Sequence, residues 1–384
     1  MSDPSPENPA PQPLRSKHTS NFPALLEQLG ISVLVTTYQA GKLVVLRYAG
    51  DSINTHFRDL PRPMGLAADP TRLAVGAAHE IRQYRNMAPV VRRLEPPGRH
   101  DACYLARAAH LTGDIDVHEM AWAGDELWFV NTRFSCLCTL NGIHSFVPRW
   151  RPPFVTALAP DDRCHLNGLG LAPDADGKLT PRYVTALAAT DTPQGWRQHK
   201  KDGGVLLDIT TNDILIRGLS MPHSPRWVNG RLWLLESGTG GFGYADLAAG
   251  RYCSVAELPG FTRGLDLFGN LAFIGMSQVR ESAVFSGIPI AERALAERAC
   301  GVWVVDIRTG HTVAFLRFED AVQEVFAVKV LPGLRYPEIA PEDPKLLADS
   351  YDLPSAALEE VPAALRLAGQ SVSPAASSDR PAGP

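Results

Sequence analysis

Short apolar segments separated by turn residues recur along most of the chain, and this pattern predicts β-strands. In VWVVDI (302–307) and TVAFLRF (312–318), apolar and polar positions alternate with the period of two that is typical of a half-buried strand. Both segments are rich in β-branched or aromatic residues, and a short turn separates them. The same succession appears in GVLLDITTNDILIRGL (204–219) and GFGYADLAAGRYCSVAEL (241–258). Each unit is therefore interpreted as a meander of short strands.

An internal repeat organises these meanders. Six segments align with one another at the loop that leads into the first strand of each unit: 62–69, 117–124, 166–173, 223–230, 262–269 and 323–330. The spacing between aligned positions ranges from 39 residues (Ser224 to Arg263) to 61 residues (Arg263 to Glu324). Four-stranded propeller blades repeat every ~40 to 50 residues when their loops are short. The repeat therefore predicts an all-β fold, a six-bladed β-propeller of four-stranded blades.

The two ends of the chain predict how the ring closes. PGLRYPEIAPEDP (332–344) follows the sixth segment where three further strands are expected, and three strand-like segments instead precede the first repeat, in residues 32–60. We predict that these N-terminal strands pair with the C-terminal strand, which leaves the ring without an open edge. The expected organisation is a disordered leader, the propeller, a partly helical extension and a disordered tail, at 1–20, 21–340, 341–369 and 370–384.

Charge and composition argue against two classes of partner. The formal net charge is −4 and Lys and Arg are dispersed, so nucleic acid is not expected to bind. No apolar run reaches the ~18 to 20 residues of a membrane span, and the polar, proline-rich first twenty residues do not resemble a signal peptide. We predict a cytoplasmic protein with free thiols, a small-molecule ligand and no membrane partner. The sequence leaves protein partners and the oligomeric state open.

The meander predicts which loops share a face. If the first strand of each blade lies nearest the axis, the loop before it and the loop between strands two and three emerge on the same side. Two of these second loops are long, 190–204 and 277–301, and we expect them to come from neighbouring blades. The spacing in AERALAERA (291–299) predicts a short helix over the mouth. Long insertions of this kind are usually lids or binding loops, although tolerated surface growth is the alternative.

Three histidines on this face suggest a metal site. His118, His165 and His223 occur in consecutive repeats, close to the aligned position, so their imidazoles could converge near the axis as ligands of a divalent metal. Zinc is preferred over calcium, for which Glu119, Asn167 and Glu324 would be the oxygen ligands. The alternative is that each histidine only makes hydrogen bonds in the channel.

The same face also predicts chemistry without a metal. Glu119 and Glu324 are the candidate acid and base, with Arg263 as the third candidate catalytic residue. Arginines there could hold a carboxylate or phosphate in a bidentate manner. The candidate ligand-binding residues are Asn167, Trp196, Arg197, Arg226, Gln278, Arg280 and Glu281. The structural alternative is that arginine and glutamate side chains pair with one another across the channel.

Several motifs carry a family resemblance. HLNGLGLAPD, GWRQHKKDGGVLLDI, GLSMPHSPRW, LWLLESGTG, LPGFTRGL, FIGMSQVRES and CGVWVVDI together resemble an uncharacterised bacterial family with a domain of unknown function, over about residues 20–340. The blade pattern is remotely similar to propellers of the gluconolactonase, strictosidine synthase and NHL-repeat groups. That similarity implies either a divalent metal held by Glu, Asn and Asp or zinc held by three histidines. The aligned column here reads Met, Glu, Asn, Ser, Arg, Glu, so neither ligand set carries over cleanly, and fold analogy does not establish function.

Two functional hypotheses of different classes follow. The first is a hydrolase or lyase, with or without an assisting metal, that acts on a small polar or anionic metabolite in the axial pocket. The second is a propeller without enzymatic activity that binds a ligand or a protein segment through its loop face. A purely structural role is the third. Polar groups enclosed under a lid would favour the enzyme, whereas an exposed apolar ring of loop residues would favour the binding protein.

Overall fold

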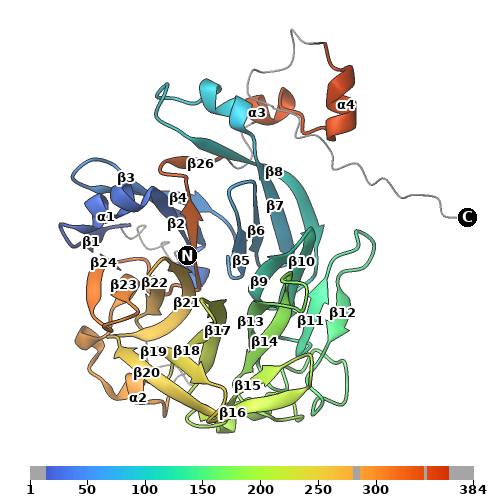
Figure 1. Ribbon diagram of the computed structural model, residues 1–384, viewed down its shortest axis with the longest axis vertical. Helices are drawn as coiled ribbons and strands as arrows, with labels where there is room; N and C mark the ends of the chain where they lie inside the picture. The colour runs from blue at the N-terminus through green and yellow to red at the C-terminus, as the bar shows by residue number, and fades with distance from the viewer. Residues whose placement is uncertain (1–13, 280–285, 341–343, 363–384) are drawn as a thin grey trace, which may run out of the picture.

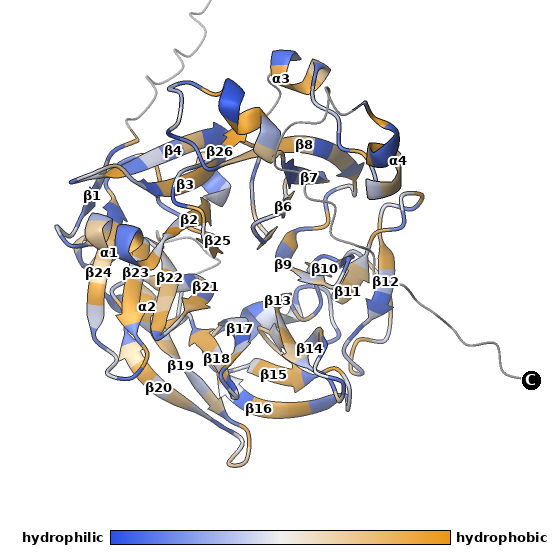
Figure 2. Ribbon diagram, turned by 45° about the horizontal axis from the view of Figure 1, so that its top comes forward, coloured by the Kyte–Doolittle hydropathy of each residue, from blue (hydrophilic) through white to orange (hydrophobic). Residues whose placement is uncertain are grey.

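Six β-sheets surround a common centre, as predicted (Figure 2). The computed structural model describes residues 14–279, 286–340 and 344–362. In every sheet the first strand lies on the inside and the following strands lie progressively further out (Figures 1 and 2). The fold is the predicted six-bladed β-propeller.

The first three blades follow one another along the chain, each with strands in meander order. Blade 1 consists of β5 (Leu66–Ala68), β6 (Arg72–Gly76), β7 (Glu80–Asn86) and β8 (Ala102–Leu111). Blade 2 consists of β9 (Val117–Ala123), β10 (Glu126–Asn131), β11 (Cys136–Thr139) and β12 (Val147–Trp150). Blade 3 consists of β13 (Leu166–Pro173), β14 (Leu179–Ala186), β15 (Gly204–Asp208) and β16 (Asp213–Leu219).

Two more blades continue the meander, and the sixth is assembled from both ends of the chain. Blade 4 consists of β17 (Pro222–Val228), β18 (Arg231–Glu236), β19 (Gly241–Asp246) and β20 (Arg251–Glu257). Blade 5 consists of β21 (Phe261–Phe268), β22 (Leu271–Ser277), β23 (Cys300–Asp306) and β24 (Thr312–Phe318). Blade 6 consists of β25 (Ala327–Pro332), β2 (Ile31–Thr36), β3 (Lys42–Tyr48) and β4 (Ile53–Asp59).

The closure of blade 6 confirms the predicted joining of the termini. β25 pairs antiparallel with β2, in a register that runs from Ile31 opposite Pro332 to Thr36 opposite Ala327. This pairing supplies backbone hydrogen bonds to β25, the inner strand of blade 6. It joins the N-terminal strands to the C-terminal strand and so closes the ring. Val33 and Val35 of β2 then pack against Val302 and Val304 of β23 in one of the apolar layers between blades.

Two short strands lie outside the predicted four-stranded pattern. β1 (Ser16–His18) pairs with β24 and extends blade 5, within the range that we assigned to the leader. β26 (Pro337–Ala340) pairs in parallel with β8 and extends blade 1. Strands from both flanks of the propeller therefore pair with the ring, and blades 1 and 5 each have a fifth strand.

Close approach of neighbouring inner strands explains a glycine in the repeat. A Cβ atom on Gly168 of β13 would lie 2.1 Å from Thr185 Oγ1 and 2.5 Å from Pro225 Cδ. Any side chain at this position would push β13 away from β17, so glycine allows the two first strands to meet near the axis.

The helical segments are short and peripheral. α1 (Phe22–Leu29) covers blade 6, and its Phe22 and Leu26 are fully buried in the layer shared with blade 5. α3 (Pro344–Ala348) and α4 (Ser355–Glu360) lie in the predicted C-terminal extension, outside the ring (Figure 1). The 3₁₀ segments are η1 (Tyr38–Ala40), η2 (Ala88–Arg93), η3 (Gly195–Gln198) and η4 (Leu295–Glu297), and α2 spans Pro289–Glu292. None of the helices in the described part of the chain is long and apolar enough to cross a membrane.

The two long loops come from blades 3 and 5, so the expectation that they belong to neighbouring blades is wrong. Blade 4 lies between them, and its own second loop is a tight turn in which Gly240 N donates to Ser237 O. This short turn leaves room for the long loops to meet above it. Ile290 N donates to Gly238 O, and Ile288 and Ile290 are fully buried against Trp196 and its neighbours. The second loop contains the short helix α2 and the turn η4 in place of one helix over 291–299.

Candidate functional site

All six blades contribute side chains to one cavity on the axis, under the long loops. The axial cavity has a volume of about 320 Å³ and is lined by Tyr38, Met64, Asp116, His118, His165, Leu187, Trp196, Met221, His223, Phe261, Arg263, Glu324 and Phe326. The predicted residues His118, His165, His223, Trp196, Arg263 and Glu324 are thus brought together. The lining is largely apolar, with a few polar groups that converge, as in a small-molecule site.

Backbone strain surrounds this cavity. Asp116, Asp162, His165, Met221 and Ser224 all adopt positive φ, between 48° and 50°. Residues other than glycine in this left-handed conformation cost roughly 1 to 3 kcal/mol each and tend to cluster at functional sites. The strain occurs at or near the start of the inner strands, and three of these residues, Asp116, His165 and Met221, line the axial cavity.

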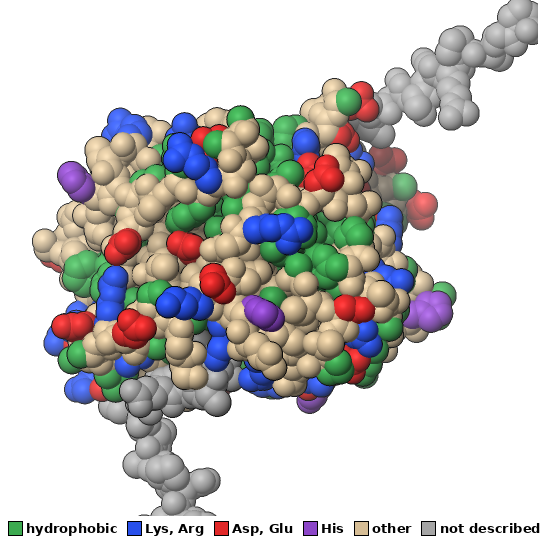
Figure 3. Space-filling view, turned by 90° about the horizontal axis from the view of Figure 1, so that it is seen from below, with side chains coloured by type: hydrophobic (Ala, Val, Ile, Leu, Met, Phe, Trp, Pro, Cys, Tyr) green, Lys and Arg blue, Asp and Glu red, His purple; other side chains and the backbone are tan. Residues whose placement is uncertain are grey.

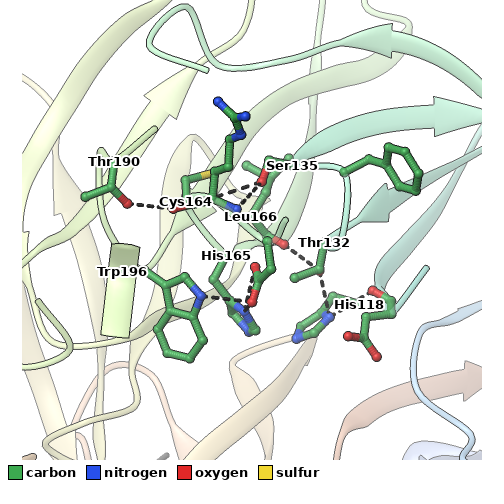
Figure 4. A network of polar contacts seen from close by, with 12 residues as sticks. His118, Thr132, Ser135, Cys164, His165, Leu166, Thr190 and Trp196 are labelled. Atoms are coloured by element: carbon green, nitrogen blue, oxygen red, sulfur yellow. Dashed lines mark hydrogen bonds and ion pairs between the residues drawn. The ribbon is translucent and has the colours of Figure 1, made fainter. Parts of the chain in front are cut away.

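His118 is a neutral hydrogen-bonding centre of the cavity. Its Nδ1 lies 2.8 Å from Thr132 Oγ1 and 3.1 Å from the carbonyl of Asp116, and the Thr132 hydroxyl donates to Leu166 O (Figure 4). Nδ1 therefore carries the proton, and Nε2 accepts a hydrogen bond from Arg263 Nη2 at 2.9 Å. Burial first, then the neighbouring His165 and Arg263, lower the pKa of His118 well below its ordinary value.

His165 is paired with a carboxylate. Its Nδ1 lies 2.9 Å from Asp162 Oδ2, and Trp196 Nε1 donates to the same oxygen at 2.8 Å. The imidazole lies between the indole of Trp196 and the ring of His118, with centroid distances of 4.4 and 4.9 Å (Figure 4). Because Nδ1 donates to the carboxylate, Nε2 is left as the accepting nitrogen. This is the arrangement in which a carboxylate orients a histidine that acts as a base.

His223, the third histidine, is held by its own blade. Its Nδ1 lies 2.9 Å from both the carbonyl of Met221 and Ser237 Oγ, so this nitrogen also carries the proton. Burial and the nearby Arg263 guanidinium lower the pKa of His223 well below its ordinary value. The ring is therefore neutral at physiological pH, like that of His118.

Arg263 is a cation without a close counterion. Its guanidinium lies on the ring of Phe326, 3.6 Å from the centroid, and donates to His118. Within the described residues no carboxylate lies within 4.0 Å of it, and its buried Nε has no hydrogen-bond partner. Burial lowers the pKa of Arg263 to about 10, although Glu324 and other carboxylates further away act to raise it. A buried cation in this state favours an anionic ligand, because an unpaired buried charge is costly.

Two carboxylates also face the cavity. Asp116 and Glu324 have no basic side chain within ion-pair distance among the residues that the structure describes. Burial raises the pKa of Glu324, and the distant Arg263 only partly opposes this shift. Asp116 also borders a second hollow of about 480 Å³, which lies beside the axial cavity and is lined by Arg133, Asp161, Asp162 and Arg197 among others.

Three other residues predicted for the site, Glu119, Arg226 and Asn167, have partners within the fold. Glu119 Oε1 accepts from Arg226 Nη2 at 2.5 Å, and this pairing raises the pKa of Arg226 although burial opposes it. Asn167 Oδ1 accepts from Thr185 Oγ1 at 2.7 Å. None of these three residues lines the axial cavity, so the geometry here matches the alternative in which arginine and glutamate pair across the channel.

The residues predicted on the long loops have different positions. Trp196 is almost completely buried, at 2% exposure, whereas Arg197 is exposed and lies over its ring at 5.0 Å. Gln278 Nε2 donates to Leu295 O, which holds the long loop of blade 5 together. Arg280 and Glu281 lie outside the described residues.

The contacts of the three histidines do not suit a metal triad. Among the described residues no group of three or more His, Cys, Asp or Glu side chains is arranged to hold a metal ion. Both nitrogens of His118 are occupied, and its Nε2 faces a guanidinium that would repel a cation. Glu119 and Asn167, proposed for calcium, already have partners. The residues therefore fit neither zinc nor calcium.

Sequence reasoning did not select Asp116, Tyr38 and Phe326, which line the cavity, or Asp162, which holds His165. Asp162 precedes His165 by three residues at the start of a strand, and this short spacing was the available signal. Asp116 stands in the equivalent loop of blade 2. Tyr38 and Phe326 belong to blade 6, where they stack at 5.9 Å across the junction of the two termini.

Other hollows have less enclosed or better paired linings. One of about 1280 Å³ lies at the rim, between blade 6 and the C-terminal extension. Another of about 560 Å³ lies at the opposite end of the axis, where Lys329 and Asp266 are paired at 3.2 Å. Acidic and basic side chains alternate over the face of the molecule seen in Figure 3, which matches the dispersed charge of the sequence.

Comparison with protein families identifies the chain. Residues 20–340 match the model of a domain of unknown function, DUF4915, so the chain belongs to this family and the predicted resemblance is confirmed. Comparison with curated proteins found no match. A solved nidogen/laminin complex matches with 11% identity and a TM-score of 0.49, over 79% of this chain and 99% of the other. A protein of unknown function from Bacteroides caccae matches with 11% identity and a TM-score of 0.47, over 78% and 98%.

Proposed function

We propose that this DUF4915 propeller is an enzyme of hydrolase or lyase type that acts on a small carboxylate-bearing metabolite in the axial cavity. The observation that carries the proposal is the His165–Asp162 pair beside a buried guanidinium that has no carboxylate partner among the described residues. One group supplies a base, and the other supplies a place for an anion.

Arg263 would hold the carboxylate of the metabolite. The contact of its guanidinium with Phe326 and its hydrogen bond to His118 hold the side chain in place before any ligand binds. The carboxylate of the metabolite would accept charge-assisted hydrogen bonds from the guanidinium, which has no carboxylate within 4.0 Å among the described residues. Binding would therefore remove an existing electrostatic cost.

His165 would act as the base. In a hydrolytic step its Nε2 would take a proton from water as the water oxygen bonds to the substrate carbon. In an elimination step Nε2 would instead take the proton from the substrate carbon. Asp162 would stabilise the resulting imidazolium through Nδ1, and Trp196 would keep Asp162 in position. The His165 imidazolium would then return this proton to the leaving group.

A panel of carboxylate-bearing esters, lactones and hydroxy acids, assayed with matched variants, tests the proposal. We expect turnover in the wild type, a fall of about 10²- to 10⁴-fold in kcat for His165→Asn, and a comparable fall for Asp162→Asn. Arg263→Gln should mainly raise KM. Arg231→Gln, at the exposed start of β18 in blade 4 and outside the axial cavity, is the control and should change neither constant.

The same assay separates the enzyme from a binding propeller. Compounds that raise the melting temperature in an Arg263-dependent manner and are never converted would support the binding function. Turnover that persists in His165→Asn would remove the proposed base.

A further inference from the structure

The axial cavity has an unusual balance of charge for a site that binds a simple anion. It contains one fixed cation, Arg263, and two carboxylates, Asp116 and Glu324. None of the three lies within ion-pair distance of an opposite charge among the described residues. Such separated, unpaired charges of both signs are the complement of a ligand that itself carries both.

The histidines do not change this balance. The Nδ1 atoms of His118 and His223 face backbone carbonyls and hydroxyl groups, and both rings are neutral because burial lowers their pKa values. His165 is matched by Asp162. Two unpaired carboxylates thus stand against one unpaired guanidinium. A ligand with only negative charge would be attracted by Arg263 and repelled by Asp116 and Glu324.

Aromatic rings line the same cavity as these charges. Tyr38 and Phe326 are stacked at 5.9 Å, and Trp196 lies on the opposite side of the cavity, in blade 3. Ring faces attract ammonium groups as well as apolar carbon. Leu187 and Met221 complete the apolar part of the wall. The wall suits an apolar side chain of modest size beside the charged groups.

We infer that the ligand of the axial cavity is a zwitterion of the amino-acid type, with its carboxylate on Arg263 and its ammonium group between Asp116 and Glu324. The inference rests on the proposed function and names its substrate class. Asp116 borders both the axial cavity and the hollow beside it.

Isothermal titration calorimetry with matched sets of three compounds tests the inference. One set is L-phenylalanine, 3-phenylpropanoate and 2-phenylethylamine, and the other is L-leucine, 4-methylpentanoate and 3-methylbutylamine. We expect at least one of the two amino acids to bind about tenfold or more tightly than the acid and the amine of its set, which corresponds to about 1.4 kcal/mol.

The variants assign each end of the ligand. Asp116→Asn and Glu324→Gln should reduce the affinity for the amino acid to that for the acid, and should leave or improve the affinity for the acid. Asparagine tolerates the left-handed backbone at position 116, so this variant is expected to fold. Asp161→Asn is the matched control, because this carboxylate lies beside the cavity but is paired with Arg163 at 3.1 Å. It should bind like the wild type.

The outcomes distinguish this inference from the proposed function. Equal binding of acid and amino acid would overturn the zwitterion and leave the carboxylate site at Arg263 standing. Equal binding of amine and amino acid, unchanged in Arg263→Gln, would overturn both. Failure of all six compounds to bind would overturn the zwitterion inference, whereas the turnover assay would still decide the proposed function.

Discussion

The axial cavity and the cluster around Glu338 contain the same kinds of residue and arrange them in opposite ways. Glu338 of β26 is surrounded by basic groups: His56 Nε2 at 2.8 Å, Arg47 Nη1 at 3.3 Å, His100 Nε2 at 3.5 Å, and Arg58 in direct contact. In the axial cavity, Arg263, Asp116 and Glu324 remain unpaired within the described structure.

The difference separates a charge that stabilises the fold from charges that are available to a ligand. Arg47, His56 and Arg58 belong to β3 and β4 of blade 6, whereas β26 pairs with blade 1, so Glu338 connects two blades next to the closure. Burial alone would raise the pKa of Glu338, but hydrogen bonds from His56 and Arg58 lower it to about 2. In the axial cavity, burial lowers the pKa of the unmatched cation Arg263. For a base this shift disfavours the charged form, whereas for Glu338 a lowered pKa favours it.

The largest expected effect is on stability, at the Glu338 cluster. Glu338→Gln should lower the free energy of unfolding by about 3 to 5 kcal/mol, because it leaves buried arginines without their counterion. Urea denaturation measures the change, and Glu319→Gln, in an exposed pair with Lys17, should lower the free energy of unfolding far less. Equal effects of the two substitutions would contradict the proposed role of Glu338.

Acid should weaken the same contact. The folded pKa of Glu338, about 2, lies below the ordinary value of 4.5, so its contribution is present above about pH 4.5 and is lost as pH falls toward 2. The full contribution is about 3 kcal/mol. Wild type should therefore lose more stability than Glu338→Gln between pH 5 and pH 3, which urea titrations across this range can measure. Parallel curves for the two proteins would show that Glu338 is not the group responsible.

Removal of the axial cation should have a smaller effect, of the opposite sign. Arg263→Gln is expected to leave the free energy of unfolding unchanged or to raise it by about 1 kcal/mol, since it removes a charge with no close counterion. The same variant should lose the affinity for carboxylates. A loss of stability as large as that of Glu338→Gln would place Arg263 among the structural residues.

The smallest expected effect concerns metal content. Elemental analysis of the purified protein, before and after incubation with zinc, should find no stoichiometric metal that depends on His118 or His223, because Arg263 faces His118 Nε2. His223→Ala should leave folding largely intact. Near-stoichiometric zinc in the wild type that is lost in both His118→Ala and His223→Ala would support the metal triad instead.

Much of the fold was predictable from the sequence alone. The repeat of apolar strands and turns determined the six blades, because every blade must bury its faces against its neighbours and so keeps a similar pattern. The strands at 32–60 and the segment near Glu324 likewise indicated the closure, since an incomplete last blade would leave an open edge. The face that collects His118, His165 and His223 also followed from the meander.

Only the tertiary structure decided which of these side chains are paired. Arg263 meets His118 across 145 positions of sequence, and Arg226 meets Glu119 across 107, although the sequence places both arginines on the same face as candidates. A repeat specifies the distance of a side chain from the axis, but not which side chain from another blade it meets. Pairing then distinguishes the two buried arginines, because Glu119 satisfies Arg226, whereas no carboxylate lies within ion-pair distance of Arg263 among the described residues.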